Sequence, residues 1–170
     1  MNNRSPFIDA EWYQLRRQEN VDAIVATSKS FLKGLGSRFS EPDFETPRIE
    51  VLLEADSPGA ARVNTPLGSA HLILEWRFDY NADEDPDDMF GVLVAAVQDS
   101  YVTHLPHKLL RLDWHVVVPV TGKVVVHSRG HELAFEKDAT FQRGGKAWRD
   151  CLPAGMALYR ALAEGRFHGS

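Results

Sequence analysis

Charged and imidazole side chains alternate with apolar ones in two segments of this sequence, 71–79 and 110–118. Side chains on a strand point to opposite faces in turn, so each segment predicts a β-strand with one apolar face and one charged face. Arginines and carboxylates on one face can orient a ligand or pair with a partner protein. We therefore take six residues as the candidate ligand- or partner-binding site: Glu75, Arg77, Arg111, Asp113, Trp114 and His115.

The same segments place carboxylates beside imidazoles. Asp113 and His115 are spaced to share a strand face, and so are His71 and Glu75. Such a pair is typical of general acid–base catalysis, but it is also common on ordinary sheets. The sequence contains no Gly-x-Ser-x-Gly elbow, no P-loop and no Gly-x-Gly-x-x-Gly fingerprint. We therefore name no catalytic residue and expect a protein that is not an enzyme.

Two histidine pairs, His104 with His107 and His127 with His131, have spacings that resemble those of metal ligands. Pro106 separates the first pair, and a predicted turn separates the second, so neither pair is forced to converge. Zinc requires three or four convergent ligands. These pairs therefore predict no metal site.

The acidic segment 79–88 begins like a calcium-binding loop. The match fails at Glu84, where a glycine is needed, and at Phe90, where a bidentate glutamate is needed. We expect a solvated acidic loop, no metal and no cofactor. Cys151 is the only cysteine, and a lone cysteine is more often a small buried hydrophobe than a nucleophile.

Bulk composition narrows the class of protein. The chain has 170 residues, a length that suits a single domain spanning 1–170. Its net charge of −5 disfavours a nucleic-acid partner, which requires clustered Lys and Arg. No apolar run is long enough for a membrane helix. With one cysteine and no such run, we expect a cytoplasmic protein.

Helices are predicted at both ends of the chain. The first spans about 9–34, with Asp9 as its cap and with Gly34 and Gly36 as stop signals. The last spans about 146–164. Pro153 either interrupts this helix or begins a separate helix over 153–164.

Between the helices, about 48–136, the pattern predicts a meander of short strands. The turn signals at 56–59 and 65–68 favour antiparallel hairpins. The segment 89–105 fits either an amphipathic helix or a buried strand, and its apolar spacing favours the helix. The predicted strands are 48–54, 60–65, 70–79, 110–118, 123–128 and 131–136.

These elements predict an α+β two-layer sandwich. We expect a mainly antiparallel sheet of about five to six strands, with the N- and C-terminal helices packed on its apolar face. Burying one large aromatic contributes about 2–3 kcal/mol, so Trp76 and Trp114 should decide which face turns inward. We also expect Leu53, which alternates with charged residues, on that face.

The charged face is typical of plain solvated surface, but it also suits recognition. Our leading hypothesis is a protein-binding module, such as an adaptor, a chaperone-like protein or an immunity-type inhibitor, that uses a sheet face or edge and binds a protein partner or a second copy. The alternative is a small-molecule-binding protein or small enzyme with a pocket between sheet and helices. A third hypothesis, a subunit of a larger assembly, would require an exposed apolar strip, for which 89–105 is the candidate.

Overall fold

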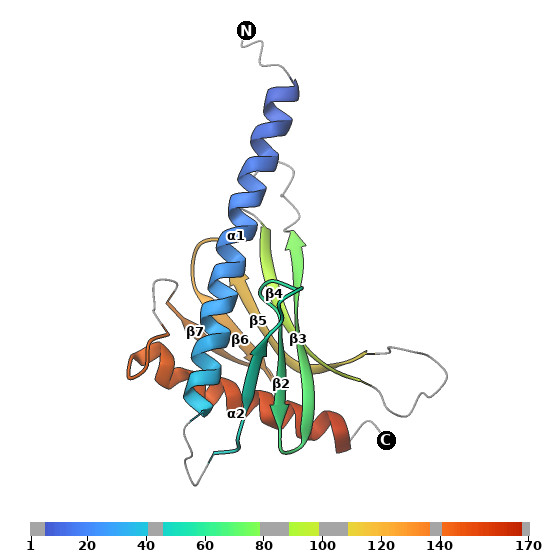
Figure 1. Cartoon of the computed structure of the whole chain (residues 1–170), viewed down its shortest axis with the longest axis vertical. Helices are drawn as coiled ribbons and strands as arrows, with labels where there is room; N and C mark the ends of the chain where they lie inside the picture. The colour runs from blue at the N-terminus through green and yellow to red at the C-terminus, as the bar shows by residue number, and fades with distance from the viewer. Residues whose placement is uncertain (1–5, 41–45, 79–88, 99–108, 137–140, 168–170) are drawn as a thin grey trace, which may run out of the picture.

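A computed structural model describes residues 6–40, 46–78, 89–98, 109–136 and 141–167 of the chain (Figure 1). A long helix opens the fold, a run of strands follows, and a second helix closes it. The elements are α1 (Pro6–Phe39), β1 (Glu50–Leu53), β2 (Ala61–Thr65), β3 (Gly68–Phe78), β4 (Met89–Gln98), β5 (Leu109–Pro119), β6 (Val124–Ser128), β7 (His131–Phe135) and α2 (Lys146–Phe167).

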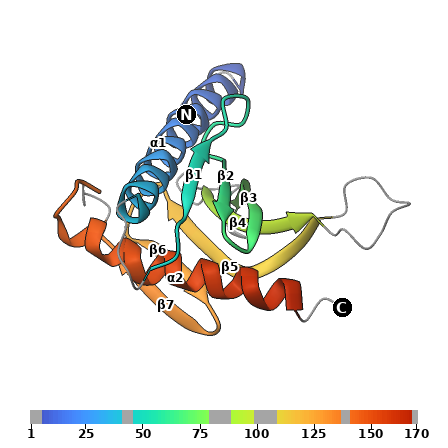
Figure 2. The same cartoon turned by 60° about the horizontal axis from the view of Figure 1, so that its bottom comes forward.

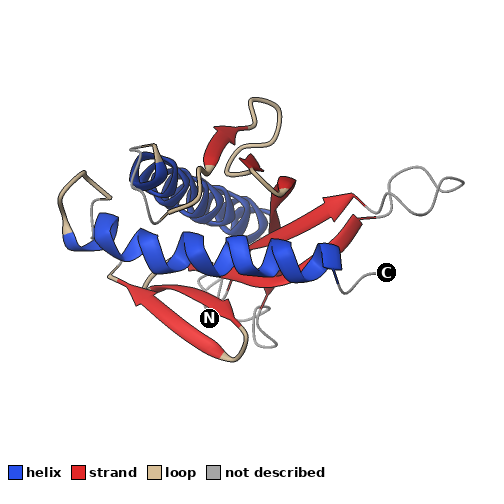
Figure 3. Ribbon diagram, turned by 90° about the horizontal axis from the view of Figure 1, so that it is seen from below, coloured by secondary structure: helices blue, strands red, loops and turns tan. Residues whose placement is uncertain are grey.

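The strands form one antiparallel sheet in which each strand pairs with its neighbour in sequence, in the order β1-β2-β3-β4-β5-β6-β7. Figure 2 shows that the sheet curls into a half-barrel, and Figure 3 shows α2 passing across one end of it. The α+β class, the antiparallel pairing and the two terminal helices are confirmed. The strand count was wrong, because the sheet has seven strands and not five to six.

The additional strand is β4, which lies in the segment expected to be a helix. Its residues pair with β3 on one side and with β5 on the other, so it occupies the middle of the sheet. Nearly all of its side chains are buried, on both faces. A strand buried on both faces needs no polar alternation, and the apolar spacing of β4 therefore resembled that of a helix. Residues 99–108, the rest of that segment, lie outside the described residues.

Helix α1 continues past the two glycines that were expected to end it. An added Cβ at Gly34 would lie 2.5 Å from Cβ of Phe141, and one at Gly36 would lie 3.2 Å from Cβ of Val51. Both glycines therefore allow neighbouring segments to approach the helix closely. They serve packing, and the helix ends only at Phe39.

Pro153 lies inside α2, which runs as a single helix from Lys146 to Phe167. Of the alternatives at Pro153, neither an interruption nor a separate second helix occurs. The proline lies in the second turn of α2 and its side chain is exposed.

Trp114 anchors the core between the helices and the sheet. It is fully buried, and its Nε1–H donates a 3.1 Å hydrogen bond to the carbonyl oxygen of Ala154 in α2. The ring of Phe31 in α1 lies 6.5 Å from the Trp114 ring, and Phe31 also contacts Phe135 of β7 edge to face at 5.8 Å. Trp114 therefore ties both helices to β5, and its inward orientation is confirmed.

Trp76 and Leu53 do not belong to this core. Trp76 is 39% exposed, and so is Leu53. Trp76 does lie on the α1 side of β3, where it lines a groove with Val21 and Val25 of the helix. The expectation that its indole would be buried was wrong, because β2 does not extend to that end of β3 and an open groove separates the indole from α1.

Candidate functional site

Three of the six candidate residues form an ion-pair cluster on the outer face of the sheet. Glu75 on β3 accepts a 2.9 Å hydrogen bond from Nη2 of Arg77 on the same strand. It also pairs with Nη2 of Arg111, which reaches across from β5. The arginine side chains are 50% and 58% exposed, whereas Glu75 is 26% exposed. Both cations therefore face solvent around a single shared carboxylate.

This Glu75 cluster lies over the small apolar side chains of β4. Glu75 pairs in register with Val92, and Arg111 with Ala96. Val92, Val94 and Ala96 are buried although they lie on the same face as the charges. Long polar side chains can cover apolar surface with their stems while their charged ends stay in water. The outer face of β4 is therefore buried at these three residues, between side chains of β3 and β5, and is not an exposed apolar strip there.

Asp113 anchors the turn between β6 and β7. Its carboxylate Oδ2 accepts a 3.2 Å hydrogen bond from the backbone N–H of Arg129. Its backbone carbonyl accepts a 2.7 Å hydrogen bond from the hydroxyl of Ser128. Arg129 has a φ of +53°, an uncommon conformation for a residue other than glycine. Asp113 thus supports a turn with an unfavourable backbone.

His115 stacks on His127 across β5 and β6. The ring centroids are 4.8 Å apart and the planes differ by 14°. Nδ1 of His127 lies 3.5 Å from Oε1 of Glu132 on β7. Burial lowers the pKa of His115, and the neighbouring His127 lowers it further, whereas Asp113 opposes the change. The environment of His115 therefore favours the neutral form of its ring.

The structure thus separates the six candidate residues. Glu75, Arg77 and Arg111 come together, Asp113 and His115 lie further along β5 next to β6, and Trp114 points the other way into the core. Trp114 positions the helices and has no surface to offer a ligand.

The sequence suggested binding at a sheet face or edge, but it did not locate the open edge that the structure contains. β2 pairs with β3 only from Gly68 to Leu72, so residues 73–78 of β3 have no strand on that side among the described residues (Figure 1). We call these residues the open edge of β3. The predicted strand lengths held the signal, because a strand over 60–65 is too short to cover one over 70–79.

A groove of about 510 Å³ runs along the open edge. Leu74 and Trp76 line it from β3, and Val21 and Val25 line it from α1. The loop before β2 closes one end, where the Ser28 hydroxyl donates a 2.7 Å hydrogen bond to the Gly59 carbonyl. The groove therefore combines an apolar wall with an unpaired strand edge.

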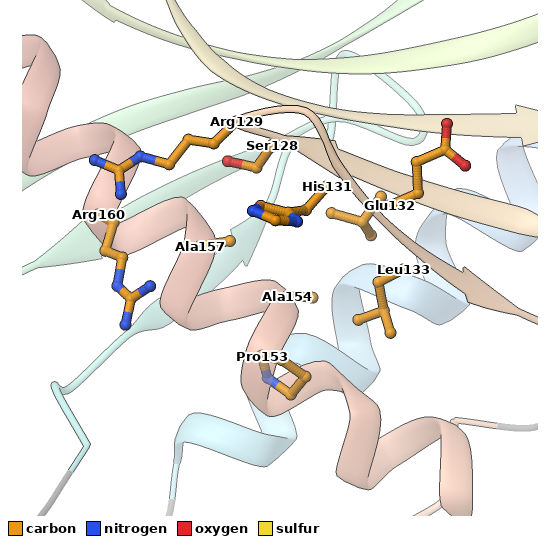
Figure 4. Close-up of a pocket in the computed structure, with 10 residues that line it drawn as sticks. Ser128, Arg129, His131, Glu132, Leu133, Pro153, Ala154, Ala157 and Arg160 are labelled. Carbon is orange, nitrogen blue, oxygen red and sulfur yellow. The ribbon is translucent and has the colours of Figure 1, made fainter.

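A second cavity lies between α2 and the β6–β7 hairpin (Figure 4). The sequence suggested a pocket between sheet and helices as an alternative, but it did not identify the residues of this one. The cavity has a volume of about 310 Å³, and we call it the α2 pocket. Ala154 and Ala157, spaced by three residues on the helix, line it from α2. That spacing of small residues was the available signal, because it leaves room on one helix face.

The remaining sequence candidates gain no catalytic or metal geometry. Burial raises the pKa of the Cys151 thiol to about 12, so the thiol stays protonated at neutral pH. His104, His107 and the acidic segment 79–88 lie outside the described residues. Within the part of the chain that the structure describes, no three His, Cys, Asp or Glu side chains gather in a way that could hold a metal ion.

No protein-family model, curated protein or solved structure matches this chain. Among the described helices, none combines the length and the apolar character that crossing a membrane requires.

Proposed function

We propose that this protein is a cytoplasmic, non-enzymatic binding module that takes an extended segment of a partner protein along the open edge of β3. The proposal treats the chain as one domain in which sheet and helices form two layers. A protein partner suits the acidic chain better than a nucleic acid does, since its net charge is −5.

The observation that carries the proposal is the unpaired backbone at Leu74 and Trp76. The two-residue turn between Thr65 and Gly68 directs the backbone groups of Gly68, Ala70 and Leu72 toward β2. By the same alternation, the N–H and C=O groups of Leu74 and Trp76 point to that side, where β2 is absent. Among the described residues, neither accepts nor donates a backbone hydrogen bond there. Such an edge pairs readily with an added strand.

The side chains around the open edge indicate which sequence would be preferred. Successive residues of an added strand would point alternately to the two faces of the sheet. On one face they would meet the apolar groove beside Trp76 and Val25. On the other they would meet Arg77 and, beyond it, Arg111. A segment that alternates apolar and acidic residues therefore fits best.

A second copy of the chain is the other partner that this edge could accept. Two open edges could pair around a two-fold axis and bring two Trp76 side chains close together. Sedimentation at increasing protein concentration separates the two cases, because only self-pairing makes the mass depend on concentration.

The test is selection from a displayed peptide library on the purified protein, followed by affinity measurement with the selected peptides. Trp76→Ala and Arg77→Glu should each weaken binding about tenfold or more. Lys33→Glu, the same charge change at an exposed site on α1, is the matched control and should leave binding unchanged. This proposed function is wrong if selection enriches no peptide, or if Trp76→Ala and Arg77→Glu bind the selected peptides as tightly as the parent chain does.

A further inference from the structure

The α2 pocket has an apolar floor and a polar rim. Val126 and Leu133 from the hairpin face Ala154 and Ala157 from the helix, and together they form the floor. Arg129, His131 and Arg160 stand around the opening (Figure 4). Its volume of about 310 Å³ is at the small end of the usual range for ligand sites. The pocket therefore suits a compact small molecule with an apolar body.

The charges around this pocket are unevenly balanced. Glu164 on α2 accepts a 3.1 Å hydrogen bond from Nε of Arg129 and also pairs with Nη2 of the same arginine. The charge of Arg129 is therefore neutralised. Glu132 is turned toward His127 on the outer face. Figure 4 shows its carboxylate on the opposite side of His131 from Arg160. Glu164 is thus engaged by Arg129, whereas Glu132 also lines the pocket but lies away from Arg160.

Arg160 is left as the cation without a counter-charge. It is exposed on α2, and among the residues that the structure describes it has no ion pair. A guanidinium group binds a carboxylate through two parallel hydrogen bonds, which gives both strength and orientation. His131 lines the same pocket and can supply a further hydrogen bond.

We propose that the α2 pocket binds a small monocarboxylic acid with an apolar body. Its carboxylate would pair with Arg160, and its apolar part would lie against Val126, Leu133 and the two alanines of α2. A single negative charge is the best match, because Arg160 is the one rim arginine without an acidic partner among the described residues. The site lies on α2 and the β6–β7 hairpin, away from the open edge of β3, and does not depend on the function proposed for that edge.

The test is calorimetric titration of the full chain with octanoate and phenylacetate, each compared with its neutral amide. We expect saturable binding of at least one acid. The matching amide should bind at least about tenfold more weakly than the acid. Arg160→Gln should weaken binding of the acid by a similar factor. Arg149→Gln, which removes the same charge from an exposed site of α2 outside the pocket, is the matched control and should bind like the parent chain.

A second variant tests the floor independently of charge. Ala157→Phe should fill the pocket and abolish binding while the thermal unfolding midpoint confirms that the chain folds. The proposal is overturned if neither acid saturates the protein at about 10 mM, a dissociation constant that corresponds to only about 3 kcal/mol of binding free energy. It is also overturned if the amides bind as well as the acids, or if Arg160→Gln and Arg149→Gln bind the acid equally well.

Discussion

His115 and His127 lie ring on ring across β5 and β6, with their centroids 4.8 Å apart. A positive charge on His127 at that distance would repel one on His115, so it makes protonating His115 harder. Burial acts in the same direction on His115 and is the larger cause of its lowered pKa. This stack makes the pair the clearest pH-sensitive element among the described residues.

Replacing His127 should raise the pKa of His115. In His127→Gln the second cause of the lowered pKa is removed while burial remains, so the value should move toward 6.5 without reaching it. Imidazole NMR signals followed against pH measure this directly. His131→Gln removes a histidine outside the stack and should leave His115 unchanged. An unaltered His115 pKa in His127→Gln would show that the two rings do not interact.

The same lowered pKa makes stability depend on pH in a defined direction. The unfolded chain binds a proton at position 115 more tightly than the folded chain does, so His115 favours folding above about pH 6.5 and loses that contribution as the pH falls. His115→Gln should therefore lose less unfolding free energy than the parent chain between about pH 7.5 and 5. Urea titrations at both pH values measure the difference, and parallel pH profiles would contradict the prediction.

Removing the shared carboxylate of the Glu75 cluster should change stability little. Exposed ion pairs contribute about 0–1 kcal/mol, and both arginine partners of Glu75 are half exposed. Glu75→Gln should therefore shift the unfolding free energy by less than about 1 kcal/mol, and by less still in high salt. Urea unfolding at low and high ionic strength checks this. A loss above about 2 kcal/mol would indicate that the cluster is a structural element of β3 and β5.

The two tryptophans of the central strands should respond very differently to shortening. Trp114→Phe removes a fully buried hydrogen bond to Ala154 and leaves a cavity, which should cost about 2–4 kcal/mol. Trp76→Phe at the open edge should cost less than about 1 kcal/mol. Chemical unfolding of both variants gives the comparison. Equal losses would mean that Trp76 is covered in solution.

Gly34→Ala should destabilise the chain although alanine is the better helix former. Alanine inside a helix is normally favoured by about 1 kcal/mol. Here its Cβ would lie 2.5 Å from Cβ of Phe141, and such overpacking costs about 1–3 kcal/mol. We expect a net loss of up to about 2 kcal/mol in unfolding experiments. Ser30→Ala, at an exposed site on the same helix, should be neutral or slightly stabilising.

The alternation of apolar and polar residues predicted the strands that have one solvent-exposed face. It failed for β4, in which both faces are buried. Strands over 70–79 and 110–118 were visible because charged residues interrupt the apolar ones. The residues of β4 carry no such interruption, since the charged residues next to them on that face belong to β3 and β5. A single segment cannot show what its neighbours in the sheet will place over it.

The candidate site was predicted in part for a similar reason. Register follows from alternation, so the meeting of Glu75, Arg77 and Arg111 on one face could be expected from the sequence. Their ion pairs depend on Arg111 reaching across β4, a strand that had been assigned to a helix. The α2 pocket depends on how a terminal helix lies on a distant hairpin, and local patterns carry no such information.

The pairing order of the sheet also bears on how the chain is made. Because every strand joins its neighbour in sequence, the meander forms through short loop closures as synthesis proceeds. α2 leaves the ribosome after the whole sheet, and until it docks, the indole nitrogen of Trp114 has no acceptor at Ala154. A chain truncated before residue 146 would therefore expose the apolar part of the sheet that α2 covers. Chaperones and proteases recognise exposed apolar surface of this kind.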